Sequence, residues 1–316
     1  MMTAFLLRRL LALVGTVATA ALVVFLVLEV LPGDPALLML GTEAQPDTLA
    51  ALRAQMGLDR PAPLRFLAWF GGFIRGDLGI SHVYARPVAE LIAERLVVTV
   101  PLTALALVIS TVAAVPLGIL AAVRHERPGD LAVQGFSQLG LAIPSFWFGI
   151  LLIFGFSVEL NWFPAGGFPG WQAGIGAGLR ALTLPALALA LPEAAILARV
   201  TRTAMLETLG EDFIRTARAK GIGATAILWR HALPNALVPV TTIIGLQAGF
   251  LMAGAVLVEN VFTLPGLGRL VFQAIAQRDL VVVKDVVVLM AILIVLLNFL
   301  VDVVHALLDP RPRAEP

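Results

Sequence analysis

Six stretches of this sequence are apolar over about 20 residues or more, the length that a helix needs to cross a lipid bilayer. They cover residues 10–31, 96–123, 131–160, 179–198, 236–258 and 281–308. Of all residues, 59% are hydrophobic and 14% are charged, a composition outside the range of ordinary soluble proteins. We therefore predict an all-α membrane protein with six transmembrane helices.

The fourth stretch is interrupted by Pro185, Pro192 and Glu193. Because prolines are tolerated in membrane helices when neighbouring groups satisfy the freed carbonyls, we expect this helix to be kinked or shifted toward the cytoplasm. An ionisable residue inside a span is a candidate for a transport pathway. Glu193 is therefore either a pathway residue or the cap of a helix segment that restarts after Pro192.

Lysine and arginine are concentrated in alternate connections between the apolar stretches. They are Arg8 and Arg9; Arg124 and Arg127; Arg199, Arg202, Arg215, Arg218, Lys220 and Arg230; and Arg311 and Arg313. Short connections rich in these residues face the cytoplasm. The pattern therefore predicts that both termini are cytoplasmic and that the connections after the first, third and fifth spans are external.

The external connection after the first span is long enough for a small subdomain. Asp47 and Gly57 bound one predicted helix, and residues 64–74, with Trp69 and Phe70, read as an amphipathic helix. We therefore divide the chain into a first span with an external subdomain (residues 1–94), a five-helix membrane domain (95–308) and a cytoplasmic tail (309–316).

The sequence lacks the residues that several functional classes need for their chemistry. The chain has no cysteine, and its four histidines are scattered without ligand spacing, so no metal site is predicted. No serine-hydrolase motif and no Gly-x-x-x-x-Gly-Lys-Ser/Thr sequence occurs. The net charge of +1 gives no indication of a basic surface that would bind nucleic acid. We expect no catalytic residue and no cofactor in this chain.

The segment between the fourth and fifth spans combines charge with helix signals. Residues 211–220 begin with acids and end with bases, and Gly221 follows, which is the order expected of a short helix. Ala217 and Ala219 have small side chains, so the outer surface of the helix is low at these positions and another protein can approach its backbone closely. The alternative is a solvated basic face that only fixes the orientation of the chain.

Residues 202–239 resemble the cytoplasmic EAA loop of the dipeptide/oligopeptide/nickel branch of ABC permeases. The sequences LPGDP at 31–35, GDLGIS at 76–81 and LPGLG at 264–268 also resemble that branch. The resemblance implies a type I ABC importer permease fold, with the loop forming a coupling helix seated in a groove of an ATPase subunit. It also implies the partners, which are a second homologous permease, two ABC ATPase subunits that bind ATP and Mg, and an external solute-binding protein.

The general EAA pattern is Glu-Ala-Ala, a glycine four residues later, and then Ile-x-Leu-Pro. With Gly221 at the glycine, Arg215, Thr216 and Ala217 occupy the triplet and His231 the isoleucine, so the first two triplet positions and the isoleucine depart from the pattern. The resemblance assigns the ATPase-coupling role to Glu211, Asp212, Arg215, Thr216, Ala217, Arg218, Ala219, Lys220, Gly221, Leu233 and Pro234.

The fifth span carries the remaining candidates. Gly245 and Gly249 form a Gly-x-x-x-Gly pair that suits close packing, either within this chain or against a partner permease. Gln247, between them, either lines a solute path or makes an interhelical hydrogen bond. An ion-gradient-driven secondary transporter is the alternative function, but it would need a larger cluster of polar groups at mid-membrane than Glu193 and Gln247 provide.

We therefore predict a permease subunit that forms half of an ATP-driven pathway for peptides or a similar small solute across the bacterial inner membrane. Dipeptides, oligopeptides, glutathione and nickel complexes all remain open as its cargo.

Overall fold

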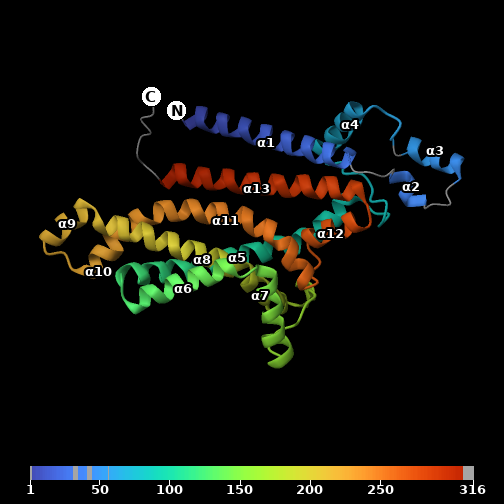
Figure 1. The fold of residues 1–316 in the computed structure, drawn as a ribbon. Coiled ribbons are helices and arrows are strands. Elements are labelled where there is room, and N and C mark those ends of the chain that lie inside the picture. Colours follow the sequence, from blue (N-terminus) through green and yellow to red (C-terminus); the bar gives the residue numbers. More distant parts are fainter. Residues whose placement is uncertain (1, 31–34, 41–44, 56, 309–316) are drawn as a thin grey trace. The chain divides into compact units, whose positions relative to one another are not determined.

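A computed structural model describes residues 2–30, 35–40, 45–55 and 57–308. Figure 1 shows that these residues fold into helices joined by turns and short loops. The LPGDP sequence, apart from its last proline, and the tail at 309–316 lie outside the described residues.

The elements are α1 (Met2–Val30), α2 (Pro35–Leu40), α3 (Pro46–Gln55), α4 (Ala62–Ile74), α5 (Val88–Val123), α6 (Pro128–Ala142), α7 (Ser145–Leu152), the π-helix η1 (Ile153–Glu159), the 3-10 helix η2 (Trp171–Ala173), α8 (Ile175–Gly210), α9 (Asp212–Ala219), α10 (Ala224–Ala226), the π-helix η3 (Ile227–Ala232), α11 (Leu233–Val261), α12 (Leu267–Ala276) and α13 (Leu280–Leu308).

The apolar helices agree with five of the six expected spans. Among the described residues, five helices are long and apolar enough to cross a membrane, at Leu10–Val30, Val88–Val123, Ile175–Gly210, Ala224–Val261 and Leu280–Leu300. The sixth is a pair of helices, Pro128–Ala142 and Ser145–Glu159, that meet at an angle of 101°. The architecture is thus an all-helical membrane fold with five spans, or six if the bent pair is one span.

The third predicted span is wrong as a continuous helix. Ile143 adopts an extended conformation with φ −90° and ψ 119°, and Pro144 follows it as the N-cap of α7. A proline disfavours the α conformation in the residue before it, so the helix ends there and a new one starts in another direction. Figure 1 shows α7 turning sharply away from the line of α6.

The fourth span contains its two prolines without a break. Pro185 and Pro192 both lie inside α8, which is 36 residues long. At 1.5 Å per residue such a helix is roughly 54 Å long, which exceeds the ~30 Å hydrocarbon core. Part of α8 therefore extends beyond the hydrocarbon layer. The alternative that Glu193 caps a restarted segment is wrong, because Glu193 lies in the helix interior.

Residue contacts divide the chain into two compact units. One contains residues 1–98 and 266–296, and the other contains residues 99–265 and 297–316. In the first unit, the start of α5 packs with α12 and the start of α13 around a core of Val88, Leu91, Ile92, Leu267, Leu270, Val271, Ala274, Val282, Val283 and Val286. The final part of the connection between α1 and α5 therefore packs into the same core as α12 and α13.

A buried carboxylate holds that connection in place. Asp279, at the turn before α13, accepts hydrogen bonds from the Ser81 hydroxyl at 2.5 Å, from the Val83 N–H at 3.2 Å and from the Val282 N–H at 3.3 Å. Ser81 and Asp279 are both about 1% exposed. Because the acceptor and its donors are buried together, the GDLGIS segment is attached to the start of α13.

The amphipathic helix predicted at 64–74 is confirmed as α4. Its rings contact one another and Phe25 of α1, with Phe25 and Trp69 stacked at a centroid distance of 6.2 Å. The Trp69 indole N–H also donates to the Asp285 carboxylate of α13 at 2.7 Å. α4 is thus anchored to α1 and α13 through one face, while Leu64, Leu67 and Ile74 stay exposed.

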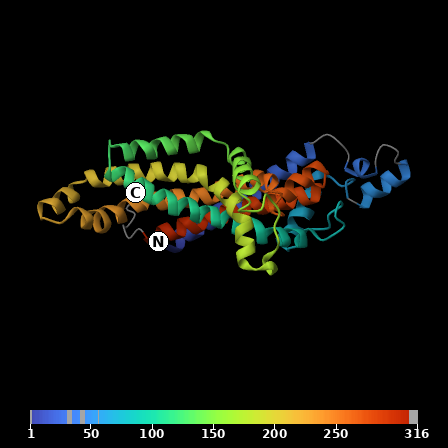
Figure 2. The same ribbon diagram turned by 90° about the horizontal axis from the view of Figure 1, so that it is seen from below.

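The second unit is built around α8. Figures 1 and 2 both show α6 and α11 running alongside α8, and both helices contact it. The core includes Ala114 and Ala121 of α5, Leu197 and Ala198 of α8, and Ala236 and Val240 of α11 among its buried residues. Most of these side chains are small, so the helix backbones lie close together.

Candidate functional site

The short helix predicted between the fourth and fifth spans is confirmed as α9. Glu211 is its N-cap residue, with an extended backbone at φ −66° and ψ 151°, and Asp212 lies in the first turn. Arg218 lies in the last turn. This order places negative charge near the positive end of the helix dipole and positive charge near its negative end, which favours a helix of only eight residues.

Gly221 ends α9 in the left-handed region, as the sequence predicts. Its φ is +80°, and its N–H bonds to the Arg218 carbonyl at 2.9 Å while the Ile222 N–H bonds to the Ala217 carbonyl at 3.2 Å. These bonds satisfy carbonyls that a helix end leaves free. A β-branched residue at this φ is strained, so glycine suits the position.

One face of α9 is fixed to the rest of its own chain. Ile214 is fully buried and Ala217 is 6% exposed, and both belong to the core formed with Met205 of α8 and Ile227 of η3. The prediction that Ala217 contributes to a low outer surface is therefore wrong. Residues 214 and 217 share one helix face, and that face packs inward against α8 and η3.

The opposite face of α9 is open. Of the predicted coupling residues, Glu211, Asp212, Arg215, Thr216, Arg218, Ala219, Lys220 and Gly221 are exposed. Two aromatic side chains of this region are also exposed: Phe213 of α9 is 43% exposed and Trp229, on η3, is 56% exposed. We call Phe213, Trp229 and Ala219 the outer patch.

The remaining coupling residues lie where η3 passes into α11. Leu233 and Pro234 form the first turn of α11. Because proline has no N–H, the carbonyl of Arg230 cannot receive the usual α-helical bond from residue 234. The preceding turn is a π-helix, Ile227–Ala232, and π-turns are often found at functional sites.

Glu193 and Gln247 meet between α8 and α11. The Gln247 side-chain N–H donates to the Glu193 main-chain carbonyl at 2.8 Å, which confirms the interhelical hydrogen bond as one role for Gln247. Glu193 Oε2 and Gln247 Oε1 are buried, and neither has a hydrogen-bond partner among the described residues. Gly245 and Gly249 of α11 are both buried.

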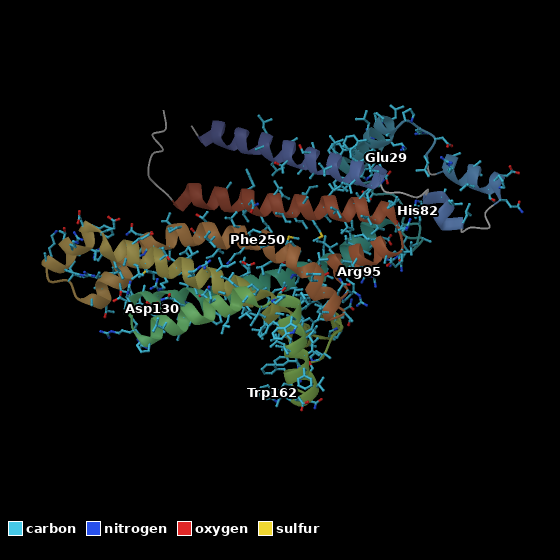
Figure 3. All side chains as sticks on the ribbon, viewed as in Figure 1. Glu29, His82, Arg95, Asp130, Trp162 and Phe250 are labelled. Atoms are coloured by element: carbon cyan, nitrogen blue, oxygen red, sulfur yellow. The ribbon has the colours of Figure 1, made fainter. Side chains whose placement is uncertain are left out.

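A buried ion pair that was not predicted from the sequence joins α6 to α8. The Arg202 guanidinium of α8 donates to both carboxylate oxygens of Asp130 of α6, at 2.5 and 2.8 Å, and Asp130 is 1% exposed. Figure 3 shows Asp130 at the end of α6 nearest α9 and α10. The sequence does contain a signal for this pair. Asp130 lies at the start of the third span and Arg202 at the end of the fourth, so both lie on the same predicted side.

A second buried carboxylate was also missed. Thr99 of α5 donates from its hydroxyl to the Glu259 carboxylate of α11 at 2.5 Å, and both residues are fully buried. Glu259 begins the 259–268 segment that carries the LPGLG sequence, so this contact attaches that segment to α5.

Two family models together match most of this chain. Residues 114–314 match the model described as the inner membrane component of binding-protein-dependent transport systems, and residues 2–103 match the model of the N-terminal part of such components. The chain belongs to this family. It is thus an ABC transporter permease, the non-catalytic inner-membrane subunit, and it works with ATPase and binding-protein partners.

Relatives agree with this assignment, and a solved structure has a similar fold. The permease is 42% identical over 314 residues to a "Putative peptide transport system permease protein" of Brucella melitensis, covering 99% of both chains. It is 40% identical over 309 residues to the glutathione transport system permease protein of Escherichia coli, covering 98% of both. The methionine ABC transporter MetNI has a similar fold, with a TM-score of 0.58 and 21% identity over 69% of this chain and 96% of that one.

Proposed function

We propose that this permease imports peptides or a related small solute such as glutathione, together with a second, homologous permease subunit and two ATPase subunits. The relatives named for peptide and glutathione transport support this cargo, because each matches almost the whole chain at about 40% identity. In this proposal α9 and the outer patch form the surface that an ATPase subunit binds.

The two faces of α9 carry this proposal. A docking surface for a moving partner needs an exposed side that the partner can bind and a second side attached to the membrane helices. The outer patch offers two half-exposed aromatic rings, a residue type that is common at interface hot spots. Ile214 and Ala217 fix the other face to α8 and η3, so a displacement of α9 is passed to the helices on either side of it.

Coupling then follows from differential affinity. A partner shifts a conformational equilibrium only when it binds one state more tightly than the other. The binding site for α9 on the ATPase would differ between the ATP-bound and ATP-free states. Each state would then bind a different permease conformation more tightly and so change the relative energies of these conformations. The permease itself needs no nucleotide site for this role.

The test compares two tryptophans with equal exposure. Trp229 belongs to the outer patch, and Trp162 is equally exposed, at 56%, but lies on the connection after η1, away from α9 (Figure 3). We expect Trp229→Ala to reduce co-purification of the ATPase and ATP-dependent uptake into proteoliposomes, by about tenfold for a hot spot. Trp162→Ala should leave ATPase retention unchanged. Equal ATPase retention in the two variants would contradict the assignment.

Tryptophan substitutions on α9 test its two faces separately. Ala219→Trp adds a bulky ring to the exposed face, so it should release the ATPase from a permease that is still folded. Ala217→Trp adds the same ring to the buried face and should lower the stability of the permease itself, because a packed core does not accommodate it. If Ala219→Trp retained the ATPase and full uptake, α9 would be only a basic connection.

A further inference from the structure

A polar cavity lies between α6 and α8 on the side of the second unit that carries α9. Its volume is about 540 Å³, and its lining residues are Val133, Gln134, Gly135, Ser137, Gln138, Arg199, Arg202 and Thr203. The apolar stretch predicted for the fourth span ends at residue 198, directly before Arg199. With the fourth span ending there, as the sequence predicts, the cavity would lie at the level where the hydrocarbon layer gives way to lipid headgroups.

The charge balance of the cavity favours an anion. Asp130 neutralises Arg202, and its carboxylate also accepts hydrogen bonds from the Glu126 N–H at 3.0 Å and the Gln134 amide at 3.0 Å. Arg199, in contrast, forms no ion pair with any residue in the described part of the chain. No acidic side chain lines the cavity in that part of the chain, so one unneutralised guanidinium faces it.

A buried hydroxyl also lacks a hydrogen-bond partner there. Ser137 is 2% exposed and lines the cavity, but its Oγ has no partner among the described residues. A buried polar group without a partner is costly, and such groups in folded proteins usually bind a ligand or water. Arg199, Ser137 and the amides of Gln134 and Gln138 together offer donors to an oxyanion.

We propose that this cavity binds a phosphate group. Its depth fits the headgroup of an anionic phospholipid, because basic pockets between membrane helices on the cytoplasmic side bind such headgroups. Leu131 and Leu139 support the lipid as the source: they lie one turn to either side of Gly135 on α6 and are 63% and 64% exposed, so they can contact acyl chains. Free phosphate has the same oxyanion chemistry without the chains.

A bound phosphate would join α6 to α8 beside the Asp130–Arg202 pair. α8 leads directly into α9, so the site lies on the route between the membrane helices and the outer patch. The proposal nevertheless stands independently of the ATPase-coupling role, because it rests only on the cavity and its lining residues.

The experiment measures thermal unfolding of the purified importer in detergent. One arm titrates phosphatidylglycerol and the other titrates inorganic phosphate against chloride at equal ionic strength. A ligand that binds the folded state raises the melting temperature in proportion to the logarithm of its concentration. We expect phosphatidylglycerol to stabilise the wild-type protein and its apparent affinity to fall about tenfold in Arg199→Gln. Arg75→Gln removes the same charge from an exposed site and should not change the affinity.

Ser137→Ala keeps the test decisive if Arg199→Gln does not fold. Removing an unpaired buried hydroxyl should not lower the stability of the ligand-free protein, whereas loss of a donor to phosphate should weaken the effect of phosphatidylglycerol. A saturable, Arg199-dependent effect of inorganic phosphate alone would identify the soluble anion as the source. If wild type, Arg199→Gln and Ser137→Ala all responded identically to phosphatidylglycerol, and all responded identically to inorganic phosphate, the proposal would be overturned.

Discussion

Individual buried carboxylates in this permease each have a specific donor. Asp130 binds the Arg202 guanidinium, Glu259 accepts from Thr99, and Asp279 accepts from Ser81. Removing a carboxylate from water is costly, and its partners must compensate for the lost hydration. The Asp130–Arg202 pair has the bidentate geometry that compensates best, and it joins two membrane helices.

Asp130→Asn is expected to destabilise the protein strongly, because it leaves the Arg202 guanidinium without its counter-charge. Breaking a buried pair in this way typically costs about 3–5 kcal/mol. Asp212→Asn is the matched control, since Asp212 also pairs with an arginine, Arg215, at 3.1 Å, but on the exposed surface of α9. Such a surface pair contributes about 0–1 kcal/mol. Unfolding of both variants in detergent would measure the difference, and equal losses would contradict it.

Helix elements in the second unit approach closely where α5 crosses α8. A Cβ at Gly118 would lie 2.5 Å from Thr201 Cβ and 2.6 Å from the Ala198 carbonyl oxygen. Neither α5 nor α8 can accept that atom without moving. Membrane helices often use small residues in this way, because dispersion contacts between backbones replace the hydrophobic effect that drives packing in water.

Gly118→Ala is therefore expected to lower the stability of the permease by about 1–3 kcal/mol through overpacking. Gly15→Ala makes the same change inside α1, where no atom of the described residues, apart from the adjacent backbone of α1 itself, lies within 4 Å of the added Cβ. That control should show no loss, because alanine is the better helix former. The melting temperatures of the two purified variants give the comparison. If Gly15→Ala lost as much as Gly118→Ala, the close approach would not be the cause.

Elements whose signals are local follow from the sequence. Helices α4 and α9 are both marked by residues within or directly beside them, such as Gly221. The inward face of α9 was readable in principle, since Ile214 and Ala217 are three residues apart in an otherwise charged helix. Pro144 marks a helix boundary, but the 101° angle depends on how α7 packs against α8 and α11, which spacing along the chain does not specify. Likewise, the pairing of Asp130 with Arg202 depends on tertiary packing.

Our proposal requires the whole molecule to be oriented so that α9 lies on the side of the membrane where an ATPase subunit can bind it. Lysine and arginine place the connection that contains α9, together with both termini, on the cytoplasmic side in our proposal. The connections after α1 and after η1 would then face the outside, where a binding protein delivers the solute. The same orientation puts the α6–α8 cavity at the cytoplasmic headgroups.

Single cysteines test this orientation without background, because the chain contains none. His82, on the connection after α1, Gln172, on the connection before α8, and Thr225, beyond α9, are all exposed. A membrane-impermeant thiol reagent applied to intact spheroplasts should label His82→Cys and Gln172→Cys but not Thr225→Cys. Permeabilised spheroplasts are the control, in which all three should react. Labelling of Thr225→Cys alone in intact spheroplasts would invert the topology, and the proposal that α9 binds a cytoplasmic ATPase would fail with it.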